Sequence, residues 1–421
     1  MTVALLKYYE RNQQKSQTKF MKTGYSIRTW RMRLVCPEPI WLDRTEEYFQ
    51  NVVEFYYHLL RQHEELWNSS LFDIQRSLEL LTLTGRDGRQ PTNPLPMGKV
   101  PVYLRRAAIN KASATVKSTQ ELQSGFPEKL EAKVTFFKGM YSDLTDRSIC
   151  LKLWNGEKWI WTDCKLKGRP FPQDGQLMSP TLVKEGRRYL LNIPVKQENS
   201  DARTAKERMA EGTNLCSVRF TNTDTFAVCC ILDEQGKQLA VHTCRGGDAY
   251  RHRCKLLETR IQKSRPNTVG DNSPQPNRKY YMHLKNLSEH YAHQVSREIV
   301  EYCKAHEVGI IAFPKYAESY EKNVKKASGN YSALHLSTRI REYLTYKAWQ
   351  SGILVIDINA KGLHENCAVC GANIVSVDKK TQECTCEAGH KTNRYLNIAR
   401  NTAKRCLTQF RKKQKTSETA G

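Results

Sequence analysis

Three cysteines and one histidine near the C-terminal end of the chain have the spacing of a zinc site. Cys367 and Cys370 form a CxxC pair, and Cys386 and His390 form a second pair in the segment CEAGH. Thiolates and an imidazole at this spacing can complete a tetrahedral zinc site. The polar residues between the two pairs (SVDKKTQE) are typical of a hairpin held by metal. The sequence therefore predicts one structural zinc ion, with Cys384 as an alternative to Cys386.

The segment that follows His390 has the pattern of an amphipathic helix, NRYLNIARNTAKRCL. A finger that leads directly into a helix resembles the C-terminal end of the TnpB family and its descendants, the miniature type V CRISPR effectors. In that family the finger lies inside a RuvC nuclease domain, and the next helix starts with N-A-D-x-N-A-A-R-N. Residues 393–401 of this chain are N-R-Y-L-N-I-A-R-N. The resemblance therefore places the family's metal-binding aspartate at Tyr395.

The other two catalytic positions that the resemblance implies also lack a carboxylate. RuvC-type nucleases hold two divalent metal ions with three carboxylates, because such ions require hard oxygen ligands. The family pattern D-L-G-x-x-N-x-A-V aligns with FTNTDTFAVC and places the first aspartate at Phe220. The pattern I-V-x-E aligns with IIAFP and places the glutamate at Pro314, or at Phe313 beside it. The resemblance thus implies a nuclease-dead member that holds no magnesium at this site.

Three carboxylates lie close in sequence to these positions and keep an active nuclease as an alternative. Asp224 is expected in a turn, and Glu318 at the exposed start of a helix. Asp357 ends an apolar strand, ILVIDI, where it could face the same site.

The composition favours a nucleic-acid partner. The 421 residues include 67 Lys and Arg against 43 Asp and Glu, a net charge of +24. Such a charge points to a polyanion, with a membrane-surface protein as the alternative. No apolar run approaches the ~20 residues of a membrane span, and the N-terminus does not resemble a signal peptide. We therefore expect a cytoplasmic, nucleoid-associated protein whose remaining cysteines are mostly reduced core residues.

The N-terminal half of the chain supplies the cationic side chains that could contact phosphates. The segment 25–35 alternates apolar with basic residues, which predicts a strand with one buried face and with Arg28, Arg31 and Arg33 exposed. Helices are expected from Asp43, which can act as a cap, and over 71–83 and 102–123. Arg105 and Arg106 at the start of the third helix could contact phosphate. The alternative for either is a solvated helix face.

Residues 129–195 have the pattern of several strands. An Asn-Gly pair between residues 151–154 and 158–161 predicts a hairpin. Trp154, Trp159 and Trp161 beside this turn are expected to pack in the core. Residues 196–211 form a charged linker and mark a domain boundary. Strands that then alternate with helices around buried segments such as VGIIAF favour an RNase H-like fold.

The expected fold class is therefore a multidomain α+β protein. A split β-barrel (wedge) with an inserted helical recognition lobe precedes an RNase H-like RuvC domain that contains the zinc finger. The expected order is a flexible lead (1–24), wedge (25–42), recognition lobe (43–125), wedge (126–200), RuvC-like domain (201–362), zinc finger (363–392), last RuvC helix (393–410) and tail (411–421).

The resemblance implies a protein that binds a guide RNA, which selects double-stranded target DNA by base pairing. A dead nuclease of this kind would repress transcription, with a transcription or defence protein as a further partner. Two alternatives stay open at this point. One is an active RNA-guided endonuclease with displaced carboxylates, and the other is a guide-independent nucleic-acid-binding protein.

Overall fold

The computed structural model describes residues 24–418, except 86, 173, 200, 202, 265–276 and 329–331. The chain divides into two compact units, one built from Ile27–Glu198 and the other largely from Asn199 onward. The predicted flexible lead, apart from residue 24, lies outside the described residues, as do residues 419–421 of the predicted tail. Residues 411–418, which we expected to lie beyond the last helix, are helical.

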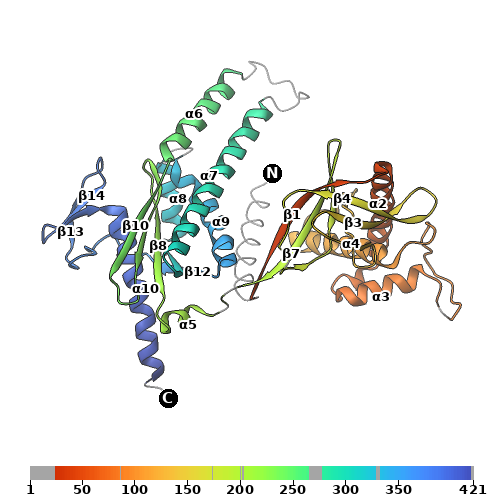
Figure 1. Cartoon of the computed structure of the whole chain (residues 1–421), viewed down its shortest axis with the longest axis horizontal. Coiled ribbons are helices and arrows are strands. Elements are labelled where there is room, and N and C mark those ends of the chain that lie inside the picture. The colour runs from red at the N-terminus through yellow and green to blue at the C-terminus, as the bar shows by residue number, and fades with distance from the viewer. Residues whose placement is uncertain are drawn as a thin grey trace. The chain divides into compact units, whose positions relative to one another are not determined.

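The first unit is a half-barrel sheet with helices inserted after its first strand (Figure 1). The sheet order is β2-β3-β4-β1-β7-β5, and β6 pairs with β7. Its elements are β1 (Tyr25–Val35), α2 (Pro39–Gln62), η1 (Glu64–Leu66), α3 (Leu71–Thr82), α4 (Val102–Leu122), β2 (Tyr141–Ser142), β3 (Ser148–Trp154), β4 (Trp159–Lys167), β5 (Gln176–Leu177), β6 (Thr181–Glu185) and β7 (Arg188–Glu198).

The first inserted helix, α2, begins earlier than the sequence predicted. Its first residue is Pro39, whereas the sequence predicts a start at Asp43 as the cap. Proline is favourable at the first helical position because its fixed φ suits the helix and its missing N–H would have no intrahelical partner. Asp43 instead lies inside the helix, where its carboxylate pairs with Lys184 of β6.

The tryptophans around the β3–β4 hairpin divide into two kinds. Trp154 and Trp159 face each other across the turn and pack on Tyr48 of α2, with ring centroids 5.0–5.4 Å apart. Trp161 is 46% exposed, so our expectation that it packs in the core is wrong. The alternation of the strand explains this, because from Trp161 onward β4 buries its even-numbered residues and turns the odd-numbered ones outward.

The second unit is a mixed five-stranded sheet of order β10-β9-β8-β11-β12, with helices on both faces. Strands β8, β11 and β12 are parallel, whereas β9 and β10 are antiparallel additions. Its elements are α5 (Ala205–Ala210), β8 (Asn214–Phe220), β9 (Thr225–Leu232), β10 (Gln238–Arg245), α6 (Gly247–Lys263), α7 (Arg278–Ala305), β11 (Val308–Lys315), α8 (Glu318–Ala327), η2 (Ala333–Leu336), α9 (Ser337–Gln350), β12 (Leu354–Asn359) and α10 (Arg394–Glu418).

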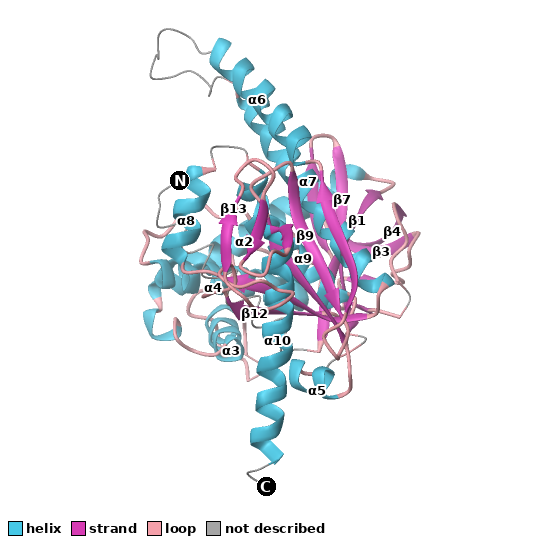
Figure 2. Ribbon diagram, turned by 90° about the vertical axis from the view of Figure 1, so that its left-hand side faces the viewer, coloured by secondary structure: helices cyan, strands magenta, loops and turns pink. Residues whose placement is uncertain are grey.

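Alternating side chains of this sheet enter two separate cores. One core joins the sheet to α6, α7 and α9, and the other joins it to α10 and α5. Figures 1 and 2 show α10 running along the sheet and continuing beyond it toward the C-terminus. Between β12 and α10 lies a small antiparallel sheet of β13 (Ile374–Val377), β14 (Glu383–Cys386) and β15 (Lys391–Asn393). None of the described helices combines the length and apolar character that crossing a bilayer requires.

The segment that we expected to be only a charged linker contains a buried arginine. Arg208 lies on α5, whose N-terminus is closed by a capping box of Thr204 and Glu207. Its side chain is 1% exposed and donates to the backbone carbonyls of Gly309 (2.9 Å) and Gly352. It is also 3.3 Å from the carboxylate of Asp201. The guanidinium therefore joins the segment before β8 to the starts of β11 and β12.

We predict that Arg208→Ala lowers the free energy of unfolding by at least about 3 kcal/mol, because it removes one partner of a buried ion pair and leaves buried carbonyls without donors. Chemical denaturation of the purified protein measures this loss. The matched control is Arg203→Ala, because Arg203 is 48% exposed and pairs with Asp201 and Glu211 at the surface. Its loss should cost about 0–1 kcal/mol. Equal effects of the two substitutions would contradict the assignment.

Candidate metal centre and catalytic positions

The four side chains predicted to bind zinc converge in the structure. The ligand atoms of Cys367, Cys370, Cys386 and His390 all lie within 4.8 Å of one another. The Sγ atom of Cys386 is 3.7 Å from that of Cys370 and 3.6 Å from Nδ1 of His390. Three thiols and one imidazole are a donor set that suits tetrahedral zinc, so these residues form a candidate zinc-binding site.

Two tight turns present these ligands, and each contains a glycine in the left-handed region. Gly371 and Gly389 both have a φ of 81°, a conformation that side chains with a Cβ rarely adopt. In the first turn the N–H of Gly371 donates to the carbonyl of Cys367, and in the second that of Gly389 donates to Cys386. The second pair, CEAGH, therefore forms a turn comparable to that of the CxxC pair.

The environment of Cys367 favours its thiolate form. Burial by itself raises the pKa of this thiol, but the backbone N–H groups of Cys370 and Val369 donate to its sulfur. The net effect is a lowered pKa, because these hydrogen bonds stabilise the charged form. A thiolate is the form that binds zinc.

The structure separates Cys384 from the candidate metal ligands. Its thiol is buried and donates to the carbonyl of Thr392 on the neighbouring strand, at 3.3 Å. It is not among the four side chains whose ligand atoms converge. Cys386 is therefore the third ligand that the geometry favours.

The asparagines of the NRYLNIARN segment attach the metal-binding region to α10. Asn397 is 2% exposed; its side chain accepts from the N–H of Ala368 (2.7 Å) and donates to the carbonyl of Asn366 (2.9 Å). Asn401 donates to the same carbonyl and to that of Leu363. The motif indicated that these residues matter, but the sequence did not show that they hold the first cysteine turn against the helix.

We predict that the purified protein contains about one zinc ion in this cluster, and that Cys386→Ser abolishes its binding. Elemental analysis after gel filtration measures the metal. Cys384→Ser is the matched control, because it changes a buried thiol two residues away that does not face the cluster. Loss of the metal from the Cys384 variant and not from the Cys386 variant would reverse the ligand assignment.

Two of the positions aligned with catalytic carboxylates are occupied by stacked aromatic rings. Phe220 ends β8, and Phe313 lies near the end of β11. Their ring centroids are 5.6 Å apart with the planes inclined by 21°. Adjacent residues of a strand point to opposite faces, so Phe313, and not Pro314, is the β11 residue beside Phe220. Pro314 is buried and lies opposite Ile358 of β12.

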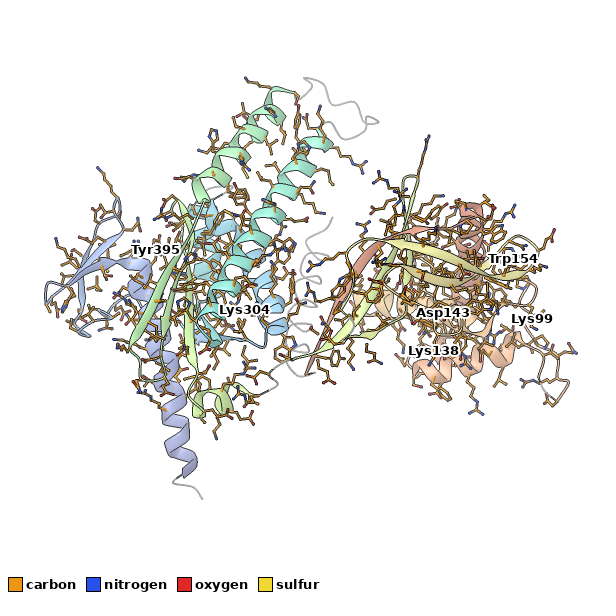
Figure 3. All side chains as sticks on the ribbon, in the orientation of Figure 1. Lys99, Lys138, Asp143, Trp154, Lys304 and Tyr395 are labelled. Atoms are coloured by element: carbon orange, nitrogen blue, oxygen red, sulfur yellow. The ribbon has the colours of Figure 1, made fainter. Side chains whose placement is uncertain are left out.

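The third position, Tyr395, is joined to the same end of β8. Tyr395, labelled in Figure 3, is 4% exposed and lies at the start of α10. Its hydroxyl donates to the side chain of Asn222 just beyond β8. The guanidinium of Arg394 lies over the Tyr395 ring at 5.3 Å. The structure thus brings the start of α10 to the end of the strand that carries Phe220.

Two further arginines lie over aromatic rings near these positions. Arg341 lies over the Phe313 ring at 5.0 Å, and Arg219 over the Tyr316 ring at 4.7 Å. Arg341 also forms an ion pair with Asp357, the residue opposite Phe313 in the β11–β12 ladder. The Nε atom of Arg219 is buried and has no hydrogen-bond partner among the described residues.

The three alternative carboxylates do not converge. Asp224 is an exposed turn residue whose backbone carbonyl accepts from Gly247, and Glu318 is 82% exposed and pairs with Lys322. Asp357 alone lies beside the stacked phenylalanines, and its charge is paired. Within the described ranges, only two groups of three or more potential metal ligands occur, and none of these carboxylates belongs to either.

The predicted nucleic-acid contacts differ in accessibility. Arg105 is 8% exposed and donates to Glu79 at 3.0 Å, so its guanidinium is held inside the helical region. Arg106 is 44% exposed and shares the same carboxylate. Arg28 is exposed and lies over Trp30. The sequence did not reveal that Arg105 is paired, because its partner Glu79 lies 26 residues away on another helix.

Arg31 and Arg33 belong to a row of exposed cations on one face of the half-barrel. Arg33 lies directly opposite Lys167 of β4, and Lys165 lies two residues further along the same strand. All four side chains are exposed, whereas Met32, Leu34 and Leu166 between them are buried. Arg31 forms an ion pair with Glu185. We call Arg31, Arg33, Lys165 and Lys167 the β1–β4 cationic face.

Two family models match parts of the chain. Residues 338–402, which include the candidate zinc ligands and Tyr395, match the model described as Cas12f1-like, TNB domain. The resemblance to the TnpB-like miniature type V effectors is confirmed. Residues 26–155 match the Aq_aa04 family. A comparison with curated proteins finds no match.

Solved structures of type V effectors share the fold. The structure described as the Cas12f1-sgRNA-target DNA complex is 12% identical with a TM-score of 0.54, covering 86% of this chain and 81% of that chain. The mini-RNA-guided endonuclease CRISPR-Cas_phi3 is 8% identical with a TM-score of 0.50, covering 94% of this chain and 97% of that chain. At these identities the likeness establishes the arrangement of the elements, and the side chains of the site must carry the functional argument.

Proposed function

We propose that this protein is an RNA-guided, sequence-specific DNA-binding protein that holds its target without cutting it. A guide RNA would bind the basic surfaces of the chain and select double-stranded DNA by base pairing. Bound at a promoter, such a complex would act as a transcriptional repressor. The partners proposed are therefore a guide RNA, target DNA, and a transcription or defence protein.

Fold, motif and charge together support the RNA-guided part of this proposal. The fold is shared with a protein solved as a complex with single-guide RNA and target DNA, and the TNB match covers the most specific motif. The net charge of +24 would balance part of the phosphate charge of a guide and its heteroduplex. The β1–β4 cationic face is one surface that such a duplex could contact.

The proposal that the protein does not cut its target rests on the stacked pair of Phe220 and Phe313 at the strand ends. Two-metal phosphodiester cleavage requires oxygen ligands that clamp both metal ions beside the attacking and leaving oxygens. A phenyl ring offers no such oxygen. Tyr395 presents a neutral hydroxyl that donates to Asn222, which makes it a poor magnesium ligand. We therefore infer that this site binds no pair of magnesium ions.

The groups that surround these rings would favour retention of a nucleic-acid strand. Arg219, Arg341 and Arg394 each place a guanidinium over an aromatic ring, where it keeps its positive charge. Arginines can pair with phosphate oxygens. A site of this composition would hold the phosphates of a bound strand, and the carboxylate beside the rings, Asp357, is already paired with Arg341.

We predict that the wild-type ribonucleoprotein binds a matched supercoiled plasmid and leaves it intact, with either magnesium or manganese present. Gel analysis of the plasmid after incubation measures cleavage, and a mobility-shift assay on the same sample measures binding. An active relative from the type V effectors is the positive control. Guide-dependent nicking that disappears in Asp357→Ala or Asp224→Ala would overturn the proposal in favour of an endonuclease with displaced carboxylates.

We predict that Arg33→Ala combined with Lys167→Ala weakens guide-RNA binding and makes the slope of log K against log salt shallower by about one to two. The reason is that binding releases fewer counterions when two phosphate contacts are lost. Filter binding over a salt series measures both quantities. The control is Lys304→Ala, which changes an exposed lysine of α7 that is paired with Glu301.

An unchanged slope in the double variant would contradict this prediction. It would mean that the β1–β4 cationic face does not contact the RNA. A wild-type protein that binds unrelated RNA as tightly as its co-purified RNA would favour the guide-independent alternative.

A further inference from the structure

A second group of metal-ligand side chains lies away from the candidate zinc cluster, where β10 meets α7. The ligand atoms of His242, Cys244 and Glu298 all lie within 4.8 Å of one another. We propose that these three residues bind a divalent transition-metal ion of the zinc class, with a fourth coordination position left to solvent or to another ligand. This site is independent of the proposed function and of the Cys367 cluster.

Local structure explains why these residues meet. His242 and Cys244 are two residues apart on β10, so their side chains point to the same face of the sheet. Helix α7 packs on this face and presents Glu298 to them. The strand β10 is an edge strand of the sheet, which leaves a route for an ion from solvent.

The burial of the three donors also fits a metal site with one open position. Cys244 is completely buried, whereas the side chains of His242 and Glu298 are 33% and 34% exposed. The thiol would therefore bind from the interior, and the imidazole and the carboxylate from the solvent side. Three protein ligands and an exchangeable fourth are typical of reactive zinc sites, whereas structural sites are closed by four.

A tyrosine whose ring packs against His242 carries a buried hydroxyl without a protein partner in the described part of the chain. The ring of Tyr302 lies against that of His242, with a centroid distance of 4.8 Å. Its hydroxyl oxygen is buried and has no hydrogen-bond partner among the described residues. A buried hydroxyl without a partner is costly, and it calls for a water or a ligand that the side chains themselves do not supply.

The hydrogen bond between Nε2 of His242 and the carboxylate of Glu298, at 2.7 Å, is the alternative explanation for their proximity. This hydrogen bond explains two of the three residues, but it gives no reason for a soft sulfur donor at the same point. Nitrogen, sulfur and oxygen donors together suit zinc and cobalt better than magnesium or calcium, which prefer oxygen alone. Cys229, which lies opposite His242 in the β9–β10 ladder, is a neighbouring thiol that could enter the fourth position.

A metal ion here would attach α7 to the edge of the sheet. Two of the three ligands come from β10 and one from α7, so occupancy would stabilise the packing of the helix on the strand. The same reasoning predicts that zinc added after the first cluster is filled raises the midpoint of thermal unfolding, since a ligand that binds only the folded state stabilises it.

The test is a metal titration of the full-length protein. The protein is first loaded with one equivalent of zinc, then titrated with cobalt, whose thiolate charge-transfer absorption reports a sulfur ligand. We expect the wild type to take up about two metal ions per chain in total, and His242→Ala, Cys244→Ser and Glu298→Gln about one. Cys303→Ser, which alters a buried thiol of α7 outside the group, is the matched control and should bind as the wild type does.

Glu298→Gln is the decisive variant, because the glutamine has the same size, can still hydrogen-bond His242, and replaces a side chain that is partly exposed. Wild type that saturates at one metal ion per chain would overturn the proposal. So would a folded Glu298→Gln variant that binds the second ion with unchanged affinity. Loss of the second ion in all three variants, with the Cys303 control unaffected, would establish the site.

Discussion

The buried guanidinium of Arg208 is the interaction on which the second unit depends most. Parallel strands cannot be joined by a tight turn, so the starts of β8, β11 and β12 reach one another from distant parts of the chain. Arg208 donates to carbonyls at the starts of β11 and β12 from the helix that precedes β8. The same strands carry Phe220, Phe313 and Asp357 at their other ends. The geometry of those positions therefore depends on a residue at the opposite ends of the same strands.

The candidate zinc cluster has a comparable role for α10. The first cysteine turn is hydrogen-bonded to Asn397, which lies two residues after Tyr395 on the helix. On the sheet side, the hydroxyl of Ser217 donates to the carbonyl of Ala399 at 2.6 Å. The asparagine on the side of the candidate zinc cluster and the serine on the side of the sheet thus fix one turn of α10 from two directions. Tyr395 is positioned by this framework, as a catalytic side chain at the same place would be.

The stacked phenylalanines at the strand ends are in contact with an arginine, because Arg341 lies over the ring of Phe313. Under the proposed function, a site without carboxylate ligands would not require bound metal ions to balance their negative charge. The carboxylate that lies beside the rings, Asp357, is paired with Arg341. Such a site would attract phosphate directly through its arginines.

The sequence by itself determined the local features of this protein. The cysteine and histidine spacing indicated the candidate metal ligands, and the strand alternation of 25–35 indicated that Arg31 and Arg33 are exposed, because both depend only on residues close in the chain. The apolar runs indicated β11 and β12 for the same reason. Only the tertiary structure decided which side chains meet across long separations. It paired Arg105 with Glu79, separated Cys384 from the metal ligands, placed Phe313 and not Pro314 beside Phe220, and buried Arg208 in a segment that resembles a linker. It also brought His242, Cys244 and Glu298 together, since no local pattern connects a strand with a helix more than 50 residues away.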